Sequence, residues 1–181
     1  VLIGIGGDLP VTIRDTDALA ELLSDPSRCA LRPSNIQRLT DSAATRGNVL
    51  NALDEVAEKA EKEDSVIIYF SGHGYQVTRT DKSRSYYLLT TGYGLDALAD
   101  TAVSGLELTK KLRAKKAKKV LVLLDCCHAG GIGQLKRPGL TLSKSPVPFQ
   151  DRNVLSSGSG WVILASSRRD EFSYTASKYS Q

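Results

Sequence analysis

Continuous apolar runs along the chain alternate with segments in which apolar residues recur every three or four positions. Three of the runs, at 1–6, 65–70 and 119–124, read "VLIGIG", "SVIIYF" and "KVLVLL". Runs of this kind are typical of strands that are buried on both faces of a parallel sheet. Shorter apolar runs predict three more strands, at 35–40, 85–90 and 160–167.

Amphipathic segments between these strands predict helices. The segment 15–25 places three leucines on one face, 45–64 carries a longer apolar stripe opposite a charged face, and 104–115 begins at Ser104, a favourable N-cap residue. Strands separated by amphipathic helices indicate a crossover topology. The fold class we expect is α/β, a mainly parallel β-sheet flanked by helices on both faces.

The segment 131–160 differs from the rest of the chain. It is rich in Gly, Pro and Ser and shows no apolar periodicity. A structureless loop of this length inside a compact domain is unusual unless it is functional or cleaved. The whole chain of 181 residues is long enough for one domain and short for two.

Charge and cysteine content narrow the classes of partner and compartment. The formal charge of +4 is concentrated in "KKLRAKKAKK" at 110–119. This run lacks interleaved aromatic residues for base stacking, so a solvated helix end is the better interpretation than a nucleic-acid site. No apolar run approaches the length of a membrane span. Three cysteines are too few for a disulfide framework, which favours a reducing, cytoplasmic location.

Two of the buried strands run directly into reactive residues. His73 follows the strand at 65–70, between two glycines, and Cys127 follows the strand at 119–124. Catalytic groups of open parallel sheets gather at the carboxyl ends of the strands. A nucleophilic thiol needs a nearby imidazole, and 54 residues separate the pair, room for one hairpin and one crossover helix. The pattern predicts that His73 and Cys127 meet at one sheet edge.

Neighbouring residues suggest how such a pair would treat a substrate. The amides of Gly74 and Cys127 are candidate donors to a developing oxyanion. Because residues two apart on a strand share a face, Asp125 should lie beside Cys127 and Ser71 beside His73. Asp15, near the end of the first strand, is a candidate second carboxylate. This acidic pocket would suit a lysine or arginine side chain.

Two other interpretations of the cysteine and histidine residues remain open. One is a zinc site formed by His73, Cys126, Cys127 and His128, although adjacent cysteines on an extended segment point apart and do not converge on a metal. The other is that Cys127 is an inert core thiol. The strand position and the Gly-flanked histidine favour a nucleophile over both, with no metal ligand expected. Cys126 faces the opposite side and is expected to be core.

The motifs "YFSGHG" and "LLDCCHAGG" resemble the histidine and cysteine motifs of the metacaspases and their bacterial relatives, the orthocaspase-type members of the caspase-like clan of cysteine peptidases. Three further stretches are similar to the same family: "IRDTDALAELL", "TRGNVLNALDEVA" and "LASSRRDEFSY". The resemblance covers nearly the whole chain. It implies a caspase-like fold and a cysteine endopeptidase that cleaves protein or peptide substrates after arginine or lysine.

The resemblance also implies roles for particular residues. His73 and Cys127 would be the catalytic dyad, and Asp15, Ser71 and Asp125 would bind the basic substrate side chain. The chain would comprise a large catalytic part at 1–130, a linker at 131–160 and the truncated start of a small part at 161–181. The linker's basic residues are candidate self-cleavage sites: Lys136, Arg137, Lys144 and Arg152.

Departures from the family pattern bear on cofactors and assembly. Calcium-dependent members carry extra aspartates near the site, whereas "LLTTGYG" and "GIGQLKR" contain none, so we expect no calcium requirement and no other cofactor. Animal caspases pair through the small subunit, which is short here, so we expect a monomer. Two functional alternatives are a non-catalytic caspase-like scaffold and a peptidase of different specificity.

Overall fold

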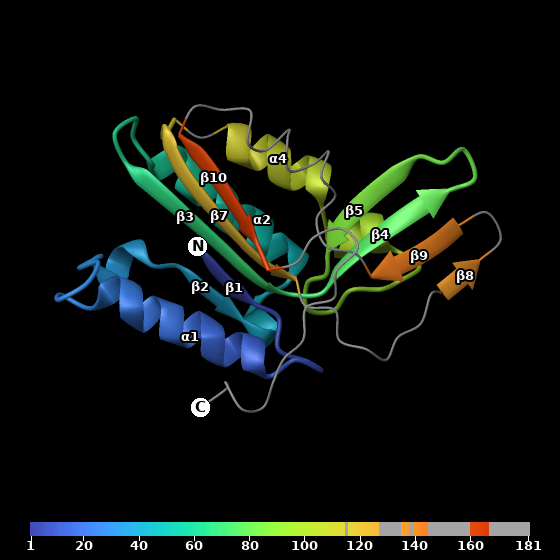
Figure 1. The fold of residues 1–181 in the computed structure, drawn as a ribbon, viewed down its shortest axis with the longest axis horizontal. Helices are drawn as coiled ribbons and strands as arrows, with labels where there is room; N and C mark the ends of the chain where they lie inside the picture. The colour runs from blue at the N-terminus through green and yellow to red at the C-terminus, as the bar shows by residue number, and fades with distance from the viewer. Residues whose placement is uncertain (115, 127–134, 138–139, 145–159, 167–181) are drawn as a thin grey trace.

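A five-stranded parallel sheet forms the centre of the computed structural model, which describes residues 1–114, 116–126, 135–137, 140–144 and 160–166 (Figure 1). Its strand order is β10-β7-β3-β1-β2, and every neighbouring pair is parallel. The strands are β1 (Leu2–Gly4), β2 (Arg38–Thr40), β3 (Ser65–Gly72), β7 (Lys119–Cys126) and β10 (Trp161–Ala165). The prediction of a mainly parallel α/β fold is confirmed.

Helices cover both faces of this sheet (Figure 1). On one face, apolar residues of α2 (Arg46–Lys59) and α4 (Gly105–Arg113) form a single core with Ile3, Ile68 and Val122 of the central strands. On the other face, α1 (Val11–Ser24) packs its leucines against Leu2 and Tyr69. The alternation of side chains along β3 and β7 therefore divides each strand between an α1 face and an α2/α4 face.

A second, antiparallel sheet extends from the carboxyl end of the first. Its order is β6-β5-β4-β9-β8. The strands are β4 (Gly74–Arg79), β5 (Arg84–Leu88), β6 (Val103–Ser104), β8 (Leu135–Arg137) and β9 (Leu140–Lys144). The sequence pattern predicted only β5. Two strands lie within 131–160, so the expectation that this segment has no regular structure is wrong for 135–137 and 140–144. β9 pairs with β4, and β8 pairs with β9.

Helix boundaries differ most from the sequence pattern at the start of α1 and at the end of α2, which stops at Lys59 rather than at 64. The first helix begins at Val11, four residues before the predicted start. Two buried threonines are accommodated in its first turns, because the Thr12 hydroxyl donates to the carbonyl of Leu9 and the Thr16 hydroxyl donates to the carbonyl of Thr12. The cap at Ser104 is confirmed: it forms a capping box with Glu107 at the start of α4. The remaining short elements are η1 (Pro33–Asn35), η2 (Asp41–Ala43) and α3 (Leu98–Thr101).

Candidate active site

The carboxyl ends of β3 and β7 lie side by side in the central sheet. Their register pairs Ser71 with Asp125 and Gly72 with Cys126. The next residues along the chain are His73 and Cys127. Cys127 and His128 lie outside the described residues. What the register establishes is that the two segments leading to the predicted dyad are adjacent and aligned.

The chain between the two strands takes the route that the spacing predicted. A β4–β5 hairpin follows His73, and α4 then crosses back to the start of β7. Leu89 donates its amide to the carbonyl of His73 at 2.9 Å, which ties the histidine backbone to the chain just beyond the hairpin. His73 is therefore held at the junction of the two sheets.

The imidazole of His73 is buried and paired with a carboxylate that the sequence analysis did not identify. Its Nε2 lies 2.9 Å and 3.0 Å from the two carboxylate oxygens of Asp8. The histidine side chain is 5% exposed, whereas that of Asp8 is 62% exposed. Asp8 reaches the histidine from the loop between β1 and α1, at the same edge of the sheet.

A local signal for Asp8 was present in the sequence "GIGGDLP". Gly6 and Gly7 have φ values of +36° and +62°, the left-handed region that favours glycine. The amide of Gly6 donates a hydrogen bond to the Thr12 hydroxyl at 3.0 Å, which fixes this turn against the start of α1. A pair of glycines followed by an acid, directly after a buried strand, indicates a shaped loop at the functional edge.

The three predicted substrate-binding residues gather on the α1 face. Burial raises the pKa of Asp15, the negative charge of Asp125 raises it further, and Arg14 opposes this shift. The two carboxylates are thus close enough to repel. Ser71 is paired with Asp125 in the register and, by strand alternation, shares its face. The Ser71 hydroxyl is buried and has no hydrogen-bond partner among the described residues.

The first cysteine of the paired-cysteine motif, Cys126, lies in the core as predicted. Cys126 is 3% exposed and belongs to the core on the α2/α4 face. The hydroxyl of Tyr86 donates to its sulfur at 3.3 Å. The prediction that Cys126 is a core residue is confirmed. Gly74, the predicted oxyanion donor, is the buried first residue of β4, immediately after His73.

The predicted self-cleavage residues fall mostly on strands. Lys136 and Arg137 lie in β8, paired with Thr141 and Leu140 of β9. Lys144 ends β9 and is paired with Tyr75 of β4. Arg152 lies outside the described residues. A backbone in a strand ladder must unpair before a peptidase can bind it in an active-site groove, so cleavage at the first three positions requires local opening.

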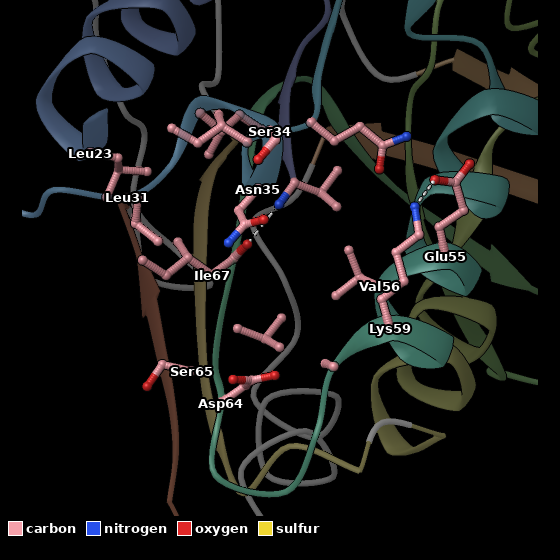
Figure 2. A pocket seen from close by; sticks show the side chains of 16 residues that line it. Leu23, Leu31, Ser34, Asn35, Glu55, Val56, Lys59, Asp64, Ser65 and Ile67 are labelled. Carbon is pink, nitrogen blue, oxygen red and sulfur yellow. Dashed lines mark hydrogen bonds and ion pairs between the residues drawn. The ribbon is translucent and has the colours of Figure 1, made fainter.

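A cavity lies at the amino ends of the strands of the central sheet, and Figure 2 shows the side chains that line it. It has a volume of about 430 Å³ and is lined by residues from the amino ends of the strands, including Val1 and Ser65, and by the Glu55–Lys59 ion pair of α2. It contains none of the predicted site residues. Among the residues that the structure describes, no group of three or more His, Cys, Asp or Glu side chains is placed to hold a metal ion. No described helix is long and apolar enough to cross a membrane.

Comparison with known proteins places these features in a family. Metacaspase-1 of Candida albicans is 26% identical over 162 residues, an alignment that covers 71% of this chain and 36% of the yeast protein. The crystal structure of protein GSU0716 from Geobacter sulfurreducens has a similar fold, with a TM-score of 0.53, 23% identity and coverage of 72% of this chain and 50% of that one. The chain thus spans half or less of the length of these relatives.

The profile of the caspase domain matches residues 1–180, almost the whole chain. The match includes both sheet-edge motifs that contain His73 and Cys127. The resemblance drawn from the sequence is therefore confirmed at the level of the family. The chain belongs to the caspase domain family of cysteine peptidases.

Proposed function

We propose that the chain is the catalytic domain of a cysteine endopeptidase that cleaves after arginine or lysine, with Cys127 as nucleophile and His73 as its base. The observation that carries this proposal is the β3–β7 register. It aligns Gly72 with Cys126, the residues that directly precede His73 and Cys127 in the sequence. Family membership supports the same assignment.

The proposed reaction is acyl transfer. His73 accepts the thiol proton of Cys127, the thiolate attacks the substrate carbonyl carbon, and the amides of Gly74 and Cys127 donate to the resulting oxyanion. His73 returns the proton to the leaving amine as the C–N bond breaks, and water then hydrolyses the acyl-enzyme. Burial of His73 supports this role, because a desolvated site strengthens its interactions with developing charge.

The proposed preference for basic residues rests on the two carboxylates of the α1 face. Asp15 and Asp125 repel one another, as the raised pKa of Asp15 indicates. A guanidinium or ammonium group bound between them would relieve this repulsion and form charge-assisted hydrogen bonds. The buried hydroxyl of Ser71, which lacks a partner among the described residues, would supply a further hydrogen bond.

Two matched fluorogenic peptides test the proposal, one ending in arginine before the dye and the other in aspartate. Each is incubated with wild type, Cys127→Ala and Cys126→Ala, in calcium and in chelator. We expect arginine cleavage that is lost in Cys127→Ala, is retained in Cys126→Ala and survives chelation. The Cys126 variant is the matched control, because it removes the neighbouring, buried thiol.

Other outcomes would redirect the assignment. Cleavage of the aspartate peptide would contradict the acidic pocket and support a peptidase of different specificity. Loss of activity in chelator, restored by calcium, would contradict metal independence. Absence of cleavage by a full-length, folded sample would favour a caspase-like scaffold.

Self-processing, assembly and location complete the proposal. Mass spectrometry of aged wild type and of Cys127→Ala would identify any cut after Lys136, Arg137, Lys144 or Arg152. Light scattering on the full-length protein would test the proposed monomer. We further propose a cytoplasmic protein without nucleic-acid or membrane partners, which fractionation of cells expressing the full-length chain would test.

A further inference from the structure

The two ring nitrogens of His73 have different surroundings. Nε2 is bonded to the carboxylate of Asp8 through both oxygens, at 2.9 Å and 3.0 Å. Nδ1 is buried and has no hydrogen-bond partner among the described residues. A carboxylate is an acceptor only, so the nitrogen that faces it must carry the proton. In the neutral ring Nδ1 is then the acceptor, with a lone pair that no described group uses.

We propose that Asp8 is a positioning residue that holds His73 in the Nε2–H tautomer and thereby makes Nδ1 the catalytic base. This inference rests on the proposed peptidase function. The thiol proton of Cys127 passes to Nδ1, the S–H bond breaks, and the ring becomes an imidazolium with both nitrogens protonated. The carboxylate of Asp8 stabilises that positive charge. Nδ1 later gives its proton to the leaving amine, and the ring returns to the Nε2–H form.

The loop that carries Asp8 is built to hold it in place. Gly6 and Gly7 turn the chain through left-handed conformations directly after β1. The Thr12 hydroxyl accepts a hydrogen bond from the amide of Gly6 and donates one to the carbonyl of Leu9, so one side chain fixes the backbone on both sides of Asp8. This matters because Asp8 is largely exposed, and an exposed ion pair without such support contributes little.

The negative charge of Asp8 also affects the pKa values of two nearby tyrosines. Burial raises the pKa of Tyr75, and electrostatic interactions with Tyr93 and with the Asp8 carboxylate raise it further. Burial and Asp8 likewise raise the pKa of Tyr93. Both phenols therefore stay protonated at neutral pH. Neither adds a negative charge that would compete with Asp8 for the protonated ring.

The tautomer of His73 can be read directly by long-range ¹H–¹⁵N NMR on the full chain. There are only two histidines, so His128→Gln assigns the spectrum. In the neutral form of the ring, we expect the wild type to show a protonated Nε2 and an unprotonated Nδ1. Asp8→Ala should give a mixture of tautomers. Asp54→Asn removes a carboxylate of α2 that is paired with Lys111 of α4; it is the matched control and should leave the spectrum unchanged.

Steady-state kinetics provide the second readout. We expect Asp8→Ala to lower kcat on the arginine peptide by at least about 10-fold, with KM within about 3-fold, because removal of the carboxylate that orients a catalytic histidine costs up to about 10⁴-fold. Asp8→Glu should recover part of the loss. Asp54→Asn should retain wild-type kcat. Thermal melting of each variant shows whether it remains folded, so that a loss of kcat through the tautomer is distinguished from a loss through unfolding.

The proposal fails if wild-type His73 carries its proton on Nδ1, or if Asp8→Ala leaves both the tautomer and kcat unchanged. The NMR experiment does not depend on peptidase activity. If wild type cleaves neither peptide, the proposed function fails separately, and the tautomer in Asp8→Ala still decides whether Asp8 positions the ring.

Discussion

The pKa of Asp15, in the second turn of α1, is raised first by burial and then by the carboxylate of Asp125, near the end of β7. The two residues are 110 positions apart in the sequence. They meet because β1 and β7 are parallel strands of one sheet and α1 begins at the edge where β7 ends. Two acidic groups brought together at this edge, with a buried hydroxyl from Ser71 beside them, form a site that favours a cation.

Neutralising either carboxylate should impair binding of basic substrates. A hydrogen bond to a charged group contributes about 1.5–3 kcal/mol, so we expect Asp15→Asn and Asp125→Asn each to lower kcat/KM on the arginine peptide by about 10- to 100-fold, mainly through KM. Initial rates over a range of substrate concentrations measure both parameters. Asp54→Asn is again the control. An unchanged KM in both variants would contradict the assignment of the pocket.

Burial of Asp15, together with its repulsion by Asp125, predicts that Asp15→Asn stabilises the fold. Because the pKa of Asp15 is raised on folding above 3.8, the ionised carboxyl disfavours the folded state. Stability falls as pH rises through the window just above 3.8 and stays lower at neutral pH. We therefore expect the variant to gain about 0.5 kcal/mol at pH 7 and nothing below pH 3.8. Urea unfolding at both pH values measures the difference, and an equal gain at both would rule out a charge effect.

The part of the site that was predictable from sequence is the part carried by strand periodicity. His73 and Asp125 terminate or follow long apolar runs, and alternation along those runs correctly separated Asp125 from the core residue Cys126. The spacing between the runs also indicated the hairpin and the crossing helix. Local pattern sufficed here because each strand is continuous and has helices over both of its faces.

What the sequence did not reveal depends on tertiary contacts. The β4 sequence "GYQVTR" has few apolar residues, and β8 and β9 lie in a Gly/Pro/Ser-rich segment, so their strand structure comes from pairing with one another and with β5. Asp8 acquires its role only when β1 and β3 pair in register, which brings the loop after Gly4 next to His73. No local propensity encodes that approach.

Close packing between β1 and α1 predicts a sharp effect of Gly4→Ala. A Cβ at this position would lie 2.6 Å from the carbonyl oxygen of Thr12 and 2.5 Å from the hydroxyl of Thr16. The helix would have to move away from the strand, so we expect a loss of about 1–3 kcal/mol and a raised KM, because α1 carries Asp15. Denaturant unfolding and peptide kinetics measure the two effects.

Gly47→Ala provides the matched control for that substitution. Gly47 lies in α2 and a Cβ there would meet nothing within 4 Å. Alanine in a helix is favoured over glycine by about 0.5–1 kcal/mol, so this variant should be more stable than wild type with unchanged kinetics. If both glycine variants had the same effect, packing of α1 on β1 would not be the cause.

The lowered pKa of Glu107 predicts a pH dependence of fold stability opposite in sign to that expected from Asp15. Burial acts to raise the pKa of Glu107, but hydrogen bonds from the side chain and backbone of Ser104 and the nearby Arg46 guanidinium outweigh it and lower the pKa below 4.5. The ionised carboxylate therefore favours the folded state. Its contribution is complete above pH 4.5 and is lost as pH falls through the lower, folded-state pKa.

Glu107→Gln tests this interaction at the start of α4. We expect the variant to lose about 1 kcal/mol at pH 7, since it loses the ion pair with Arg46 and weakens the capping box, and to approach wild type at pH 3. Glu55→Gln is the matched control: its ion pair with Lys59 is more exposed, so its effect should stay within about 0.5 kcal/mol. A loss in Glu107→Gln that does not diminish as the pH falls below 4.5 would attribute the effect to packing, because protonation progressively removes the wild-type charge at this position.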